Sequence, residues 1–172
     1  TVGIQFRQSS DGIRDTGAYV GDVIRKYKQP DLALIRIRKP PTDLAVLPLG
    51  SMYEIEIGSE VHAIGHPEEK YWTYTKGVVS QIREKFQWRY GDVSSHEATV
   101  IQTQTPINPG SSGGPLFSNE GELIGINSFG NTDAASINFA VSVKHVRALL
   151  AGDYPEPMKL TTLPEPLERY SS

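Results

Sequence analysis

The chain has 172 residues, of which 38% are hydrophobic and 22% charged, values typical of a globular domain with its own core. Its 17 basic and 20 acidic residues give a net charge of −3, which gives no support to general electrostatic binding of nucleic acid or anionic membranes. The absence of cysteine excludes disulfides, thiolate zinc sites and cysteine nucleophiles. No apolar run approaches the ~20 residues of a membrane span.

Short segments with alternating apolar residues, many of them rich in Thr, Val, Ile and Tyr, predict strands along most of the chain. They cover residues 1–7, 18–27, 31–38, 60–65, 73–82, 98–105, 115–117, 122–129 and 137–141. Residues 89–96 are polar and predict a loop. Many short strands followed by a single helix favour a barrel or a sandwich.

The one predicted helix follows the last strand. Ser142 is placed to cap it, and Gly152 and Pro155 are placed to end it. Its apolar residues share one face: Val143, Val146, Leu149 and Leu150.

The most informative segment is NPGSSGGPL, residues 108–116, in which glycines bracket Ser112. A nucleophilic serine needs a tight turn that projects its hydroxyl while backbone N–H groups converge on one point, where they stabilise an oxyanion. Glycine permits the backbone angles of such a turn and the close approach of a substrate. The alternative at this stage is an ordinary glycine-rich hairpin loop.

Four segments in order extend this motif: DLALIRI (31–37), EIGSEVHAIGHPEE (55–69), TPINPGSSGGPLFSNEGELIGINSF (105–129) and INFAVSVKHVRALL (137–150). With them the sequence resembles the chymotrypsin-like serine proteases, specifically the HtrA/Deg branch. The resemblance implies an all-β fold of two antiparallel six-stranded-type β-barrels, the first incomplete here, with one C-terminal helix. The implied divisions are residues 1–50, 51–152 and a proline-rich tail or linker over 153–172.

The resemblance also implies roles for individual residues. Ser112 corresponds to the nucleophile, and Asp31 to the carboxylate that orients the general base. The N–H groups of Gly110 and Ser112 correspond to the oxyanion hole. A polypeptide substrate would bind as an added strand beside residues 127–129.

The residues implied near that substrate are Ile107, Asn127, Ser128, Phe129, Ile137 and Phe139. None is acidic, which favours a small or medium apolar residue before the cleaved bond over Lys or Arg. Plain core packing is an equally good interpretation of Phe139. No cofactor is expected, and the scattered histidines give no metal-ligand spacing.

A general-base histidine is missing from its expected place. In the resembled family it precedes the aspartate, whereas His62, His66, His96 and His145 all follow Asp31. Three explanations compete: a fragment of a larger protease whose upstream segment carries the histidine, a pseudoprotease that only binds peptides, or substitution by a downstream histidine. The opening TVGIQFRQSSDG resembles the strand that follows the family's histidine, which favours the first.

Other classes are disfavoured. GSSGG fits the elbow of α/β-hydrolases, but residues 115–126 read as a hairpin rather than a helix. By resemblance an extracytoplasmic location is expected, and further parts of a parent protein, such as a PDZ-type domain, are possible partners.

Overall fold

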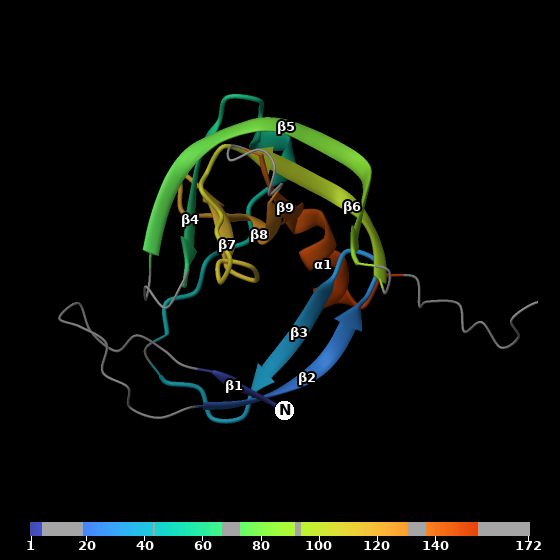
Figure 1. Cartoon of the computed structure of the whole chain (residues 1–172). Coiled ribbons are helices and arrows are strands. Elements are labelled where there is room, and N and C mark those ends of the chain that lie inside the picture. The colour runs from blue at the N-terminus through green and yellow to red at the C-terminus, as the bar shows by residue number, and fades with distance from the viewer. Residues whose placement is uncertain (5–18, 43, 67–72, 92–93, 131–136, 155–172) are drawn as a thin grey trace, which may run out of the picture.

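A computed structural model describes residues 1–4, 19–42, 44–66, 73–91, 94–130 and 137–154. The chain forms one closed barrel, one open three-stranded sheet and a helix that lies between them (Figure 1). This arrangement confirms the predicted chymotrypsin-like fold with an incomplete first barrel. The turn expected over residues 9–12 and the tail from residue 155 lie outside the described residues.

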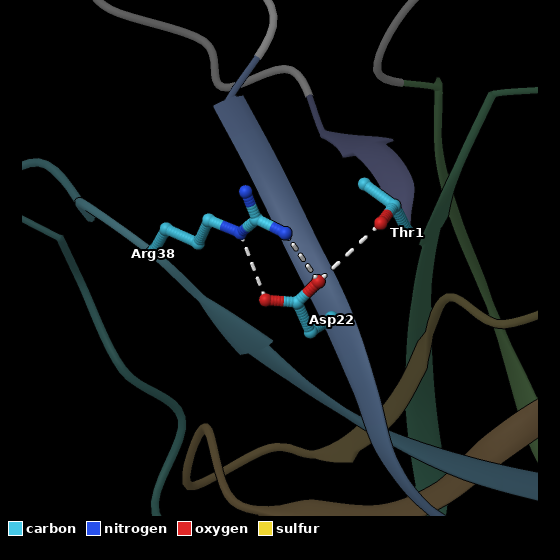
Figure 2. Close-up of polar contacts among 3 residues, drawn as sticks. All are labelled: Thr1, Asp22 and Arg38. Atoms are coloured by element: carbon cyan, nitrogen blue, oxygen red, sulfur yellow. Dashed lines mark hydrogen bonds and ion pairs between the residues drawn. The ribbon is translucent and has the colours of Figure 1, made fainter.

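The open sheet is antiparallel, in the order β1–β2–β3. Its strands are β1 (Val2–Ile4), β2 (Tyr19–Tyr27) and β3 (Leu32–Ile37). On its surface the carboxylate of Asp22 accepts hydrogen bonds from Nε and an Nη of Arg38 at 2.8 and 2.9 Å, and from the hydroxyl of Thr1 at 3.4 Å (Figure 2). The hydrogen bond from Arg38 is the main cause that lowers the pKa of Asp22.

Six strands close the barrel in the order β4–β5–β6–β9–β8–β7, with β4 pairing back onto β7. Two clusters of buried apolar side chains fill it, one around Ile101 and one around Phe139, and Leu32 of β3 packs against the second. The strands are β4 (Glu60–Gly65), β5 (Thr73–Tyr90), β6 (Ser94–Thr103), β7 (Pro115–Ser118), β8 (Leu123–Gly130) and β9 (Asn138–Ser142).

The hairpin formed by β5 and β6 is longer than the sequence predicted. The β5 strand runs for 18 residues to Tyr90, and β6 resumes at Ser94, so most of the loop expected over 89–96 is strand. Polar side chains misled the prediction because this part of the hairpin extends beyond the barrel core, where strands carry polar and exposed residues. The extension reaches the turn between β2 and β3, where the N–H of Glu97 donates to the carbonyl of Gln29 at 2.9 Å.

The helix α1 (Val143–Ala151) begins and ends as predicted. The Ser142 hydroxyl accepts from the N–H of Lys144, and Gly152 ends the helix in the left-handed conformation with φ of 75°. Leu150, which the sequence places on the same apolar face, is 45% exposed. Helical spacing put Leu150 at the edge of the apolar face, and the core is filled by its neighbours.

Two arginines fasten α1 to the rest of the chain. Arg25 of β2 donates to the carbonyls of Leu149 and Leu150 at 3.0 and 2.6 Å, where the negative end of the helix dipole favours a cation. Arg147 donates to the carbonyls of Leu49 and Gly50 at 2.8 and 2.9 Å. The helix therefore ties the open sheet and the segment between the two halves to the barrel. Neither α1 nor the short 3-10 turn Met52–Glu54, among the described residues, has the length and apolar character to span a bilayer.

Candidate active site

Asp31 and Ser112 come from different halves of the fold and line one cavity of about 300 Å³. Asp31 lies in the turn before β3, and Ser112 lies in the loop before β7. Both are exposed to solvent. The rest of the lining combines apolar and polar side chains: Leu32, Tyr90, Gly113, Ile126, Asn127, Ser128 and Val141.

The loop around Ser112 is a tight turn built on glycine. Gly110 and Gly113 have φ of 95° and 85°, angles that side-chain-bearing residues rarely adopt. The N–H of Gly114 donates to the carbonyl of Ser111 at 3.0 Å, and the N–H of Gly113 donates to the carbonyl of Asn127 at 2.7 Å. These bonds fix the loop against β8, so the Ser112 side chain projects from a rigid support.

Ser111 packs this loop against the end of β4. It is buried, with 6% of its surface exposed, and it fills the space above Gly65 at the end of β4. A Cβ atom built on Gly65 would lie only 2.5 Å from the Ser111 hydroxyl oxygen. The loop can sit this close to β4 only because residue 65 has no side chain.

The hydroxyl of Ser112 donates to the carbonyl of Ser128 at 2.7 Å. The pairing of β8 with β9 shifts between Asn127 and Phe129, so Ser128 is the extra residue of a bulge. A bulge re-aims the backbone of its extra residue, which here directs the Ser128 carbonyl toward Ser112. A carbonyl oxygen accepts this hydrogen bond but cannot remove the proton, so the contact does not activate the serine.

Two amides beside the serine are available to an incoming oxyanion. Within the described part of the chain, the N–H groups of Gly110 and Ser112 donate to no protein acceptor. The carbonyl of Gly110 accepts from the N–H of His66 at 3.3 Å, which fixes one side of that peptide. Free, fixed donors beside a serine hydroxyl are what acyl transfer requires.

Several of the residues predicted to lie near the substrate are buried. Ile107, Asn127 and Phe139 are 8%, 1% and 6% exposed. Phe139 stacks on Phe86 inside the second core cluster, with ring centroids 4.8 Å apart, and Ile137 packs against the same cluster. Asn127 still lines the cavity, and its side-chain N–H donates to the carbonyl of Pro115 at 3.3 Å.

Ser128 and Phe129 lie at the bulge of β8. Ser128 is half-buried and lines the cavity. The backbone of Phe129 pairs with Phe139 of β9. Of the six residues predicted near the substrate, the structure thus brings Asn127 and Ser128 to the cavity with Ser112.

Sequence reasoning missed Tyr90. Its side chain lines the cavity, and its hydroxyl lies 3.2 Å from that of Ser128. The signal was present in the alternation of Phe86, Trp88 and Tyr90, which continues the strand period to the end of β5. The polar residues over 89–96 hide this signal, because they are more typical of a loop than of a strand.

None of the described residues that line the cavity is a histidine. His62 bonds to side chains on β5 and on the turn after β7, and His66 is exposed. His145 lies on α1, where its Nε2 accepts from the N–H of Thr99 at 2.9 Å; burial, aided by the charge of Lys144, lowers its pKa. His96 bonds to the turn that carries Asp31. Within the described residues no group of three His, Asp or Glu side chains could hold a metal ion.

Comparison with known proteins identifies the family. The trypsin-like peptidase domain matches residues 3–126, which include both Asp31 and Ser112. The chain belongs to this family. Within it, the sequence is 40% identical over 139 residues to "Serine protease HTR4" of Rattus norvegicus and 37% identical over 116 residues to "Probable periplasmic serine endoprotease DegP-like" of Hahella chejuensis. These relatives place the peptidase domain on the HtrA/Deg branch.

The chain corresponds to part of each relative. The matches cover 81% and 67% of this chain but only 27% and 23% of the two relatives' lengths. A solved structure, "HtrA-type protease AlgW with decapeptide", superposes with a TM-score of 0.65 at 28% identity, covering 82% of this chain and 43% of that chain.

Proposed function

We propose that this domain hydrolyses peptide bonds as a serine endopeptidase, with Ser112 as the nucleophile and Asp31 as the carboxylate that orients the base. The observation that carries the proposal is that Asp31 and Ser112, far apart in sequence and in different halves of the fold, line one cavity. Family membership supports the same chemistry.

The chemistry would proceed by acyl transfer. The Ser112 oxygen attacks the peptide carbonyl while a base removes its proton, and the carbonyl oxygen becomes an oxyanion held by the N–H groups of Gly110 and Ser112. Losing one such donor costs about 3 kcal/mol of transition-state stabilisation. Before attack the hydrogen bond between the Ser112 hydroxyl and the Ser128 carbonyl must break. A backbone N–H of the substrate could then donate to that carbonyl as the peptide binds as a strand beside β8.

The base is proposed to be a histidine in a segment of the parent protein that precedes these residues. The cavity between Asp31 and Ser112 is the place where such a ring would have to lie in order to contact both. Within this chain His62 and His145 already bond to other groups and lie on other elements.

The substrate is proposed to be an extended polypeptide with a small or medium apolar residue before the cleaved bond. No described residue of the cavity other than Asp31 is acidic, so nothing beside Ser112 would select Lys or Arg. An extracytoplasmic location is proposed because relatives on this branch include proteins described as periplasmic.

Labelling with a fluorophosphonate probe tests the nucleophile. We expect the domain, extended by its upstream segment, to be labelled at Ser112, and Ser112→Ala to abolish labelling. Asp31→Asn should lower the rate of peptide hydrolysis by about 10⁴ if the aspartate orients the base. Asp22→Asn makes the same chemical change in the same half of the fold but outside the cavity, and it should leave the rate of hydrolysis unchanged. A wild-type rate in Asp31→Asn would refute the role of Asp31.

A second candidate is a pseudoprotease that binds peptides without cleaving them. It is favoured by the absence of histidine among the described residues of the cavity. Calorimetry with apolar peptides, together with labelling of the wild-type chain, separates the two. Peptide binding without any fluorophosphonate labelling, even with the upstream segment restored, would support the pseudoprotease and overturn the endopeptidase.

A further inference from the structure

The turn that carries Asp31 adopts a conformation that needs support. Tyr27 pairs with Leu32, so β2 and β3 are joined by the four residues between them, and Asp31 has φ of 58°. The left-handed region is unfavourable for residues with a side chain, although aspartate tolerates it better than most. Within the turn the N–H of Asp31 donates to the carbonyl of Lys28 at 3.2 Å, a long bond that holds this conformation weakly.

Support comes from the other half of the fold. The Nδ1 atom of His96, on β6, lies 2.9 Å from the same Lys28 carbonyl, and the N–H of Glu97 donates to the carbonyl of Gln29 at 2.9 Å. A carbonyl can only accept, so Nδ1 of His96 must carry the proton. The other ring nitrogen lies 3.0 Å from the hydroxyl of Ser94, which can donate to it.

The His96 ring is fixed by its neighbours on the hairpin. It stacks on Trp88, with ring centroids 5.4 Å apart and planes 26° apart, and the ring of Tyr90 meets it edge-on at 5.4 Å. A ring held on two sides loses little further freedom when it makes a hydrogen bond, so its Nδ1–H is aimed before the contact forms. The same Tyr90 reaches Ser128, whose carbonyl holds Ser112.

We propose that His96 is a positioning residue for Asp31: from the second barrel, its Nδ1–H holds the Lys28 carbonyl and so fixes the turn that presents the Asp31 carboxylate to the cavity. This role rests on the proposed function, because only a peptidase needs that carboxylate in one place. Without His96 the Lys28 carbonyl keeps only its bond from the Asp31 N–H, and the Glu97–Gln29 bond is left as the backbone contact that holds the turn against β6, so the conformation of residue 31 is less well supported.

The test compares two substitutions in the full chain. His96→Ala removes the donor, whereas His96→Asn keeps an N–H in nearly the position of Nδ1. By NMR hydrogen exchange, we expect the Asp31 amide to exchange about tenfold faster in His96→Ala and within about twofold of wild type in His96→Asn. His62→Ala is the matched control, since His62 bonds to Tyr74 and Asn119 rather than to the turn, and its loss should leave the Asp31 amide unchanged.

The kinetic arm uses fluorophosphonate labelling of Ser112 with the upstream segment present. We expect His96→Ala to label about fivefold to tenfold more slowly and His96→Asn to recover the rate, with unfolding midpoints measured alongside. If His96→Ala changes neither exchange nor labelling by more than about twofold, or if it unfolds the hairpin and His96→Asn rescues nothing, the proposal is wrong. If wild type is not labelled at all, the proposed function fails while the exchange data still decide whether His96 holds the turn.

Discussion

Replacing Gly65 with alanine tests whether the serine loop depends on its close approach to β4. The added Cβ would lie 2.5, 2.7 and 2.9 Å from Oγ, Cβ and Cα of Ser111, all closer than such contacts normally occur. Ser111 cannot retreat freely, because it is buried and its carbonyl and N–H are both bonded within the loop. The loop or the end of β4 must therefore shift.

Overpacking of this kind costs about 1–3 kcal/mol, which corresponds to a fall in Tm of about 2–12 °C for a chain of this size. Urea denaturation with the Tm measured in parallel gives both values. Fluorophosphonate labelling should fall by more than the loss of folded protein explains, because the displaced residue is covalently joined to Ser112. Gly3→Ala is the matched control, because a Cβ at Gly3 meets nothing within 4 Å and should change stability by less than about 0.5 kcal/mol.

A double substitution tests whether the contact with Ser111 causes the loss of stability. In Gly65→Ala/Ser111→Gly the two shortest contacts disappear and only the contact with the Cα atom remains, so part of the lost stability should return. Wild-type stability and labelling in Gly65→Ala would show that the loop does not rest on β4 as described.

Three further outcomes are expected. Arg25→Ala removes two hydrogen bonds to the end of α1 and should cost about 1–2 kcal/mol in urea denaturation; a change below about 0.5 kcal/mol would contradict the role of this contact. Because burial lowers the pKa of His145, the unfolded chain binds a proton that the folded chain does not, so stability should fall as pH drops from about 6.5 toward the folded value. His145→Gln keeps an acceptor for Thr99 and should flatten that pH dependence. In Arg38→Ala, NMR titration should show the pKa of Asp22 rising toward its ordinary value, because the hydrogen bond that lowers it is gone. In the wild type, the stability that Asp22 contributes is present above its ordinary pKa and is lost as pH falls through the lowered folded-state pKa. An unchanged pKa in the variant would exclude Arg38 as the cause.

The sequence predicted the elements whose signals are local. Alternating residues located β2, β3 and β4 closely, and the pair Ser142 and Gly152 located both ends of α1. The glycine-bracketed Ser112 also stands out without a structure, since positive φ at Gly110 and Gly113 is what such a turn demands.

Features that depend on contacts between distant segments were not predictable in the same way. The hairpin beyond the barrel is stabilised by pairing with its own partner strand and with the turn at Gln29, so polar residues there did not prevent strand formation. Because that hairpin folds against the half that carries Asp31, Tyr90 comes to line the cavity and His96 bonds to the turn at Lys28. Phe139 shows the converse: family resemblance suggested a role near the substrate, and packing against Phe86 places it in the core.

The position of α1 at the end of the described fold has a consequence for synthesis. This helix makes the bonds that join Arg25 of β2 and the Leu49 carbonyl to the barrel, and β4 cannot close the barrel until β7 exists. As the chain leaves the ribosome, the aspartate half emerges first and the serine half later, and α1 adds the last bonds to the contacts that β6 makes with the turn before β3. A nascent chain would therefore carry Ser112 before Val141 of β9 completes the lining of its cavity.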